Sequence, residues 1–151
     1  MTTSCAICQI HADPKQISDL EICRTELWVL RHHDTPSPLL GWLLLDTVRH
    51  CGGPVDFQVE EANSWGKAVQ QASQLVRSMT GCDRVYAIAF GEGAQHLHLH
   101  LIPRFISDIT TAAWSVADHY RAVAGGHVPG VDRDQVEDFV QRARLCHGLI
   151  F

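Results

Sequence analysis

The sequence predicts an α+β domain built from about five short strands, one long helix and a C-terminal helical region. Histidine and aliphatic residues alternate over residues 96–101, and a period of two indicates a strand because successive side chains point to opposite faces. Apolar residues recur at intervals of three and four over residues 59–79, which indicates an amphipathic helix. A sheet with a helix packed on it accounts for both patterns.

Composition restricts the class of protein. The chain has 151 residues, of which 46% are hydrophobic, enough for one domain with a substantial core. The net charge is −5 with neutral histidines and there is no long run of Lys or Arg, so we expect no nucleic-acid surface. The longest apolar runs, such as residues 39–45, are too short to span a membrane.

The first residues of the chain indicate where in the cell the protein is expected. A charged segment followed by an apolar one would indicate a signal peptide, and the first residues show no such order. We therefore expect a cytoplasmic protein. Its six cysteines are then expected to be reduced thiols or metal ligands rather than disulfides.

The remaining elements follow from local pattern. Strands are expected over residues 17–22, 26–32, 41–47 and 85–90, and helices over 112–124 and 131–146. Gly81 is expected to end the long helix, and Pro103 to end the histidine strand because it has no N–H to donate. His32 and His33 are expected at an exposed strand end.

The alternating stretch places three imidazoles in one row. His96, His98 and His100 would share one face, with Leu97, Leu99 and Leu101 in the core behind them. Neutral imidazole is a nucleophile, a proton shuttle and a metal ligand near neutral pH. A polar strand face that happens to consist of histidine is the alternative explanation.

Residues 96–102 match without a gap the motif His-φ-His-φ-His-φ-φ, with φ apolar, and the chain here resembles the histidine triad (HIT) family. The resemblance covers residues 5–104. It implies a HIT-like fold, with an antiparallel β-sheet of about five strands and one long helix packed on it. We therefore expect a single domain, 1–151, with a HIT core over 1–104 and a C-terminal helical extension over 105–151.

The resemblance also implies a reaction. In that family the middle histidine, here His98, attacks the α-phosphate of a nucleotide and forms a covalent nucleotidyl-histidine intermediate. The third, here His100, lies near the bridging atom and helps the leaving group depart. The expected substrate is a purine nucleotide, as a dinucleoside polyphosphate or a nucleoside phosphoramidate, cleaved at a P–O or P–N bond. Related proteins are often two-fold homodimers, and the sequence leaves the oligomeric state open.

Four further residues are candidates for phosphate binding. Gly91 and Gly93 would let backbone amides approach a phosphate, although two glycines in a hairpin turn explain them equally well. Gln95 precedes the first histidine, and Arg104 follows the proline that ends the motif. A surface arginine would explain Arg104 equally well.

Cys5 and Cys8 form a Cys-x-x-Cys knuckle, a spacing that places two thiolates on one metal ion. A redox dithiol or two small buried cysteines are the alternatives. The resemblance implies a structural zinc ion completed by His50 and His96. Four protein ligands would leave no open position for water.

Two features depart from the family pattern. Trp42 stands where the family often has a histidine that supports the triad, and the link over residues 91–94 is shorter than in many HIT hydrolases. Both favour an alternative function, a zinc-stabilised nucleotide-binding module with little turnover. A third interpretation makes the three histidines ligands of a catalytic metal ion that activates water.

Overall fold

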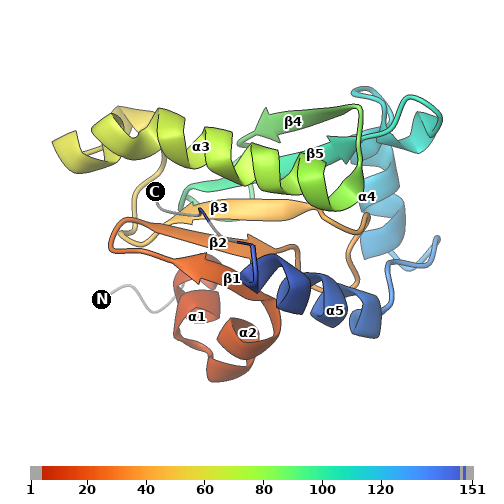
Figure 1. Ribbon diagram of the computed structural model, residues 1–151, viewed down its shortest axis with the longest axis horizontal. Helices are drawn as coiled ribbons and strands as arrows, with labels where there is room; N and C mark the ends of the chain where they lie inside the picture. Colours follow the sequence, from red (N-terminus) through yellow and green to blue (C-terminus); the bar gives the residue numbers. More distant parts are fainter. Residues whose placement is uncertain (1–4, 147, 149–151) are drawn as a thin grey trace.

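One antiparallel sheet forms the centre of the molecule (Figure 1). The computed structural model describes residues 5–146 and 148. The strands lie in the order β1-β2-β3-β5-β4, which places the histidine strand β5 between β3 and the edge strand β4. Their bounds are β1 Glu21–Arg24, β2 Trp28–His32, β3 Leu43–Thr47, β4 Arg84–Ile88 and β5 His98–Arg104.

Helices cover the sheet unevenly. The longest, α3, packs across β3, β5 and β4, and α5 packs across β1 and β2 (Figure 1). The bounds are α1 Ala6–Ala12, α2 Pro14–Leu20, α3 Val59–Thr80, α4 Val116–Ala124 and α5 Arg133–Arg144, with 3₁₀ turns at Pro54–Asp56 and Ile109–Thr111. No helix in the described ranges has the length and apolar character needed to cross a membrane.

The alternation along β5 separates two layers of the core. Leu99 and Leu101 belong to the main core under α3 and α5. Ile102 points the other way and joins a second cluster with Trp42 and Val116 of α4. His98 and His100 share the face of Ile102 because they are an even number of residues away from it. This face therefore carries the candidate site, and α4 closes one end of it.

The ends of α3 follow helix-capping chemistry. Gln58 and Glu61 form a reciprocal capping box at its start. Gly81 ends it in the left-handed conformation, with φ of 68°, which glycine adopts without steric cost. The predicted α+β fold, with about five antiparallel strands and one long helix packed on them, is confirmed.

The strand predicted over residues 17–22 is wrong in its first part. Helix α2 occupies Pro14–Leu20, and β1 begins only at Glu21. Asp13 accepts a hydrogen bond from the backbone N–H of Lys15, and Pro14 stands at the first helical position. These two helix-start signals outweighed the short apolar alternation that suggested a strand.

Two other boundaries were also predicted wrongly. Pro103 lies inside β5, opposite Val85. Strand β3 pairs with β5 only as far as Leu101, so β5 has a single neighbour at Pro103 and the missing N–H is tolerated there. The helix expected over residues 112–124 begins at Val116, after the Ile109–Thr111 turn.

Candidate active site and metal centre

His98 lies on β5 opposite Asp46 of β3 and is half-buried. Its Nδ1 lies 2.7 Å from the backbone carbonyl oxygen of His96. A carbonyl oxygen can only accept, so Nδ1 of His98 carries the proton and donates it. The lone pair of His98 is therefore on Nε2, the nitrogen farther from its own backbone.

His100 has the opposite tautomer. Its Nδ1 accepts a hydrogen bond from the indole Nε1–H of Trp42 at 3.0 Å, so the ring proton sits on Nε2. Burial, assisted by His98, His33 and Arg31, lowers the pKa of His100 to about 3. The ring is thus neutral at physiological pH and presents an N–H.

A cluster of aromatic rings packs beside His100. His33 lies 5.5 Å from Tyr120 of α4 and 5.7 Å from Trp42, measured between ring centroids. Trp42 also packs on Tyr120. Burial lowers the pKa of His33 as well. The expected exposed strand end at His32 and His33 is wrong, because His32 is fully buried and contacts the Phe139 ring.

A buried ion pair lies under the site. Arg31 donates from Nε to Oδ2 of Asp46 at 2.6 Å, and the Nε2 of His11 lies 2.9 Å from the same oxygen. Burial opposes the charged form of Asp46, but the charge and hydrogen bonds of Arg31 and His11 lower its pKa. Sequence analysis missed this pair, whose only signal was one charged residue in each of two apolar strand runs.

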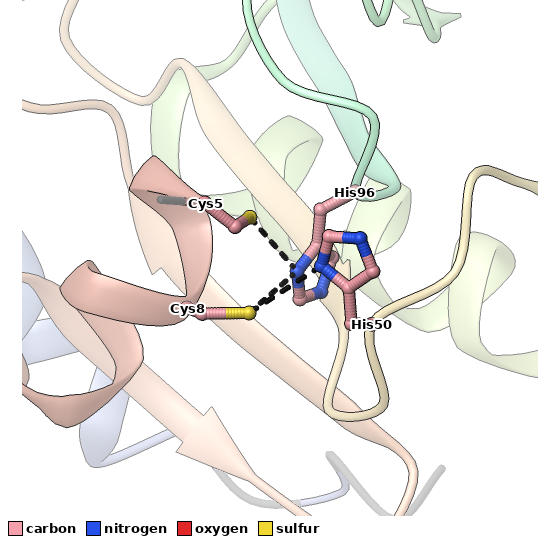
Figure 2. A group of neighbouring side chains, drawn as sticks. All are labelled: Cys5, Cys8, His50 and His96. Atoms are coloured by element: carbon pink, nitrogen blue, oxygen red, sulfur yellow. Dashed lines mark hydrogen bonds between the residues drawn. The ribbon is translucent and has the colours of Figure 1, made fainter. Parts of the chain in front are cut away.

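Two cysteines and two histidines converge next to the triad. Cys5 and Cys8 come from the start of α1, His50 from the loop after β3, and His96 from the approach to β5 (Figure 2). One ligand atom from each residue can be chosen so that all four lie within 4.8 Å of one another. The four residues named from the resemblance are therefore brought together by the fold.

The distances fit one tetrahedral ion. The Sγ atoms of Cys5 and Cys8 lie 3.6 and 3.4 Å from Nδ1 of His96, and Cys8 Sγ lies 3.5 Å from Nδ1 of His50 (Figure 2). Zinc–sulfur and zinc–nitrogen bonds at a tetrahedral angle give a sulfur–nitrogen separation of about 3.6 Å. The donor set and its spacing both suit zinc.

The ring of His96 is already oriented for such an ion. Its Nε2 lies 2.7 Å from the carbonyl oxygen of Thr47, so Nε2–H donates and the Nδ1 lone pair points to the sulfurs. Burial, together with the hydrogen bond and charge of Cys5, raises the pKa of Cys8. A bound cation would favour the thiolate form.

The predicted phosphate-binding residues separate into two groups. Gly91 and Gln95 line a hollow of about 780 Å³ that His50 and Phe90 also border. Gly91 has a φ of 72°, a conformation that favours glycine, and Gly93 lies in the same exposed loop. Arg104, at the other end of β5 from His98, instead donates to Asp108 and Thr111 in the following segment.

Comparisons with known proteins point to one fold. No family model matches the sequence, and no curated protein does. A HIT-like protein involved in cell-cycle regulation from Bartonella henselae aligns with a TM-score of 0.66 at 16% identity, over 95% of this chain and 97% of that one. A zinc-bound histidine triad family protein from Mycobacterium smegmatis aligns with a TM-score of 0.66 at 17% identity, over 95% of each chain.

A histidine triad protein from Bradyrhizobium japonicum is similar at 25% identity, with a TM-score of 0.62 over 87% of this chain and 93% of that one. The structural similarity and the sequence motif thus agree on the fold. This chain has the histidine triad fold, and its own triad lies on β5 and the residues leading into it. The fold implied by the sequence resemblance is confirmed.

Proposed function

We propose that the protein is a nucleotidyl hydrolase or transferase of the histidine triad type, acting on the α-phosphate of a purine nucleotide derivative. One observation carries the proposal. The His98 ring donates from Nδ1 to the carbonyl oxygen of His96, which leaves the Nε2 lone pair available as a nucleophile. His98 is also half-buried, whereas His96 and His100 are buried.

The reaction is a double displacement at phosphorus. His98 Nε2 forms a bond to the α-phosphorus, the bond to the bridging atom breaks, and its electron pair leaves with the departing group. The ring keeps its Nδ1 proton, so the adduct carries a positive charge that the His96 carbonyl oxygen stabilises. Water or another acceptor then attacks phosphorus and releases its proton to solvent, the Nε2–P bond breaks, and its electron pair returns to Nε2.

His96 links the nucleophile to the cysteine cluster. Cys5, Cys8, His50 and His96 would hold a structural zinc ion, which when bound would tie α1 to the residues preceding β5. The side chain of His96 is one of these ligands, and its carbonyl oxygen orients His98. The cluster thus stabilises the backbone on which the nucleophile depends.

Substrate binding belongs to the same proposal. The hollow bordered by Gly91 and Gln95 would receive the phosphate chain, with Gly93 in the loop beside it. Arg104 would not contact the phosphate itself. It would contribute indirectly, by holding residues 105–111 in place through its hydrogen bonds. A cytoplasmic location and a homodimer remain predictions.

A binding module with little turnover is the second candidate. The observation that favours it is Trp42, which contacts His100 where related proteins often carry a histidine. The interpretation as a metal-dependent hydrolase has less support from the geometry. His96 faces the cysteines, and the Nδ1 of His98 is engaged by the backbone, so the three rings do not converge on one point.

Steady-state kinetics of His98→Ala test the proposal. With a panel of adenylated and guanylated substrates, we expect turnover to fall by a factor on the order of 10³ or more, because no other group replaces the nucleophile. His127→Ala removes an exposed histidine from the loop after α4 and is the matched control, with unchanged rates expected. Turnover in His98→Ala close to the unsubstituted rate would refute the nucleophile, and no turnover by the unsubstituted protein would favour the binding module.

A further inference from the structure

The hydrogen bond between Trp42 and His100 joins two buried rings that lie 58 positions apart in the sequence. Trp42 is 2% exposed and His100 is 7% exposed. An indole N–H can donate but never accept. The nitrogen of His100 that faces Trp42 must therefore remain unprotonated for as long as this contact persists.

The surrounding packing prevents Trp42 from turning away. Its ring packs against Tyr120 of α4 at 5.6 Å and against His33, which directly follows β2, at 5.7 Å between centroids. Val116 and Ile102 complete the cluster around it. A second proton on His100 would sit on Nδ1 and face the Nε1–H of Trp42, placing two donors against each other inside this closely packed cluster.

Three of the charged and titratable groups around His100 act in the same direction as burial. His98 lies on the same strand, Arg31 comes from β2 and His33 directly follows β2, and each disfavours a positive charge on the ring. Asp46 of β3 favours that charge, but its carboxylate is already paired with Arg31 and His11. Tyr120 is the titratable group that α4 contributes to this side. His100 thus stays neutral, with its proton on Nε2.

We propose that Trp42 is a positioning residue that restricts His100 to donating a hydrogen bond without giving up its proton, so that the site selects phosphoanhydrides over phosphoramidates. The proposal rests on the function proposed above. A phosphoanhydride is a substrate whose leaving group departs as a stable phosphate anion. A phosphoramidate releases an amine, which has to take up a proton as it leaves.

The two reactions differ in where a proton is needed. With an anhydride, the His98 Nε2–P bond forms, the P–O bond breaks, and the electron pair stays on a phosphate oxygen that accepts a hydrogen bond from His100 Nε2–H. With a phosphoramidate, the pair from the broken P–N bond would stay on nitrogen, which is far too basic to leave as an anion. Neutral His100 could supply that proton only by becoming an imidazolate.

Nitrogen-15 NMR tests the protonation state without requiring turnover. In histidine-labelled protein, we expect His100 to show a protonated Nε2 and a bare Nδ1 from pH 5 to pH 8, with the signals assigned by their loss in His100→Gln. In Trp42→Phe the donor is absent, and we expect the two tautomers of His100 to mix. Trp42→His, which can accept as well as donate, is the second variant should the first fail to fold. A second proton on His100 of the unsubstituted protein within this range would overturn the proposal.

Kinetics test the selectivity. At pH 7.5 we expect kcat/KM for a diadenosine polyphosphate to exceed that for adenosine 5′-phosphoramidate by about 100-fold or more, the size of a general-acid contribution. In Trp42→His we expect that ratio to fall by about tenfold or more, through kcat of the phosphoramidate rather than KM. Equal rates on both substrates in the unsubstituted protein would overturn the proposal. Absence of turnover on either would refute the proposed function and the selectivity together, while the NMR result would still decide the Trp42–His100 contact.

Discussion

His98 and His100, neighbours on one face of β5, differ in tautomer because they have different hydrogen-bond partners. His98 donates from Nδ1 to a carbonyl oxygen, and His100 accepts at Nδ1 from an indole. Each partner can play only one role in a hydrogen bond, so the tautomer of each neutral ring is fixed. The chemistry of the strand is therefore determined by the residues behind the rings as much as by the rings.

His32 shows the same principle in the core. It is fully buried, its Nδ1 lies 2.9 Å from the carbonyl oxygen of His33, and its Nε2 accepts from the backbone N–H of Gly41 at 2.9 Å. Burial lowers the pKa of His32 to about 4, so the folded state holds the neutral ring where the unfolded chain binds a proton. The stabilisation is complete above about pH 6.5 and is lost as the pH falls toward 4.

We therefore expect the free energy of unfolding to decrease by about 3 kcal/mol from His32 alone between pH 6.5 and pH 4. Urea denaturation at a series of pH values measures it. His32→Gln keeps a donor and an acceptor and should remove that part of the pH dependence, whereas the exposed-site control His127→Gln should retain it. An unchanged slope in His32→Gln would show that His32 does not carry the effect.

At the scale of elements, the ion pair between Arg31 and Asp46 joins β2 to β3, and His11 extends it to α1. The Arg31 and Asp46 side chains are at most 4% exposed. Removal of one partner leaves a buried charge without compensation, which typically costs about 3–5 kcal/mol. Asp46→Asn is thus expected to be strongly destabilising.

The double variant Arg31→Leu with Asp46→Leu tests whether the cost arises from the unpaired charge. We expect it to unfold at a higher urea concentration than Asp46→Asn, because neither charge remains in the interior. If Asp46→Asn is as stable as the unsubstituted protein, the pair contributes nothing to the junction of these elements.

The cysteine cluster joins α1 to the loop after β3 and to the approach to β5 (Figure 2). If the cluster holds zinc as proposed, we expect Cys5→Ala not to retain zinc and to lower Tm by roughly 5–10 °C, because a ligand that binds only the folded state stabilises it. Atomic absorption and thermal denaturation measure the two quantities. Cys146→Ala lies outside the cluster and should retain zinc. An unchanged zinc content in Cys5→Ala would remove that residue from the ligand set.

At the scale of the whole molecule, the sequence predicted what depends on local pattern. The alternation before Ile102 located the strand and its two faces, and the stripe over residues 59–79 located α3. The spacing of Cys5 and Cys8 identified a knuckle, and the fold brings it to His50 and His96. These features can be predicted because each lies within one element or one motif.

What sequence analysis missed depends on strand register. Arg31 meets Asp46, and Trp42 meets His100, only because β2, β3 and β5 are neighbours in one particular alignment. A pattern within one strand carries no information on which residue of another strand it will face. The start of α2 was missed for a different reason, since Asp13 and Pro14 outweighed a weak alternation.

The central claim is that His98 becomes covalently bonded to phosphorus during turnover. Rapid quenching during the first turnover with a diadenosine polyphosphate, followed by intact-mass and peptide mass spectrometry, tests it most directly. The account predicts a protein mass increased by one adenylate, located on the peptide that contains His98, at the earliest times. A first turnover that releases product while the protein mass never increases would contradict it.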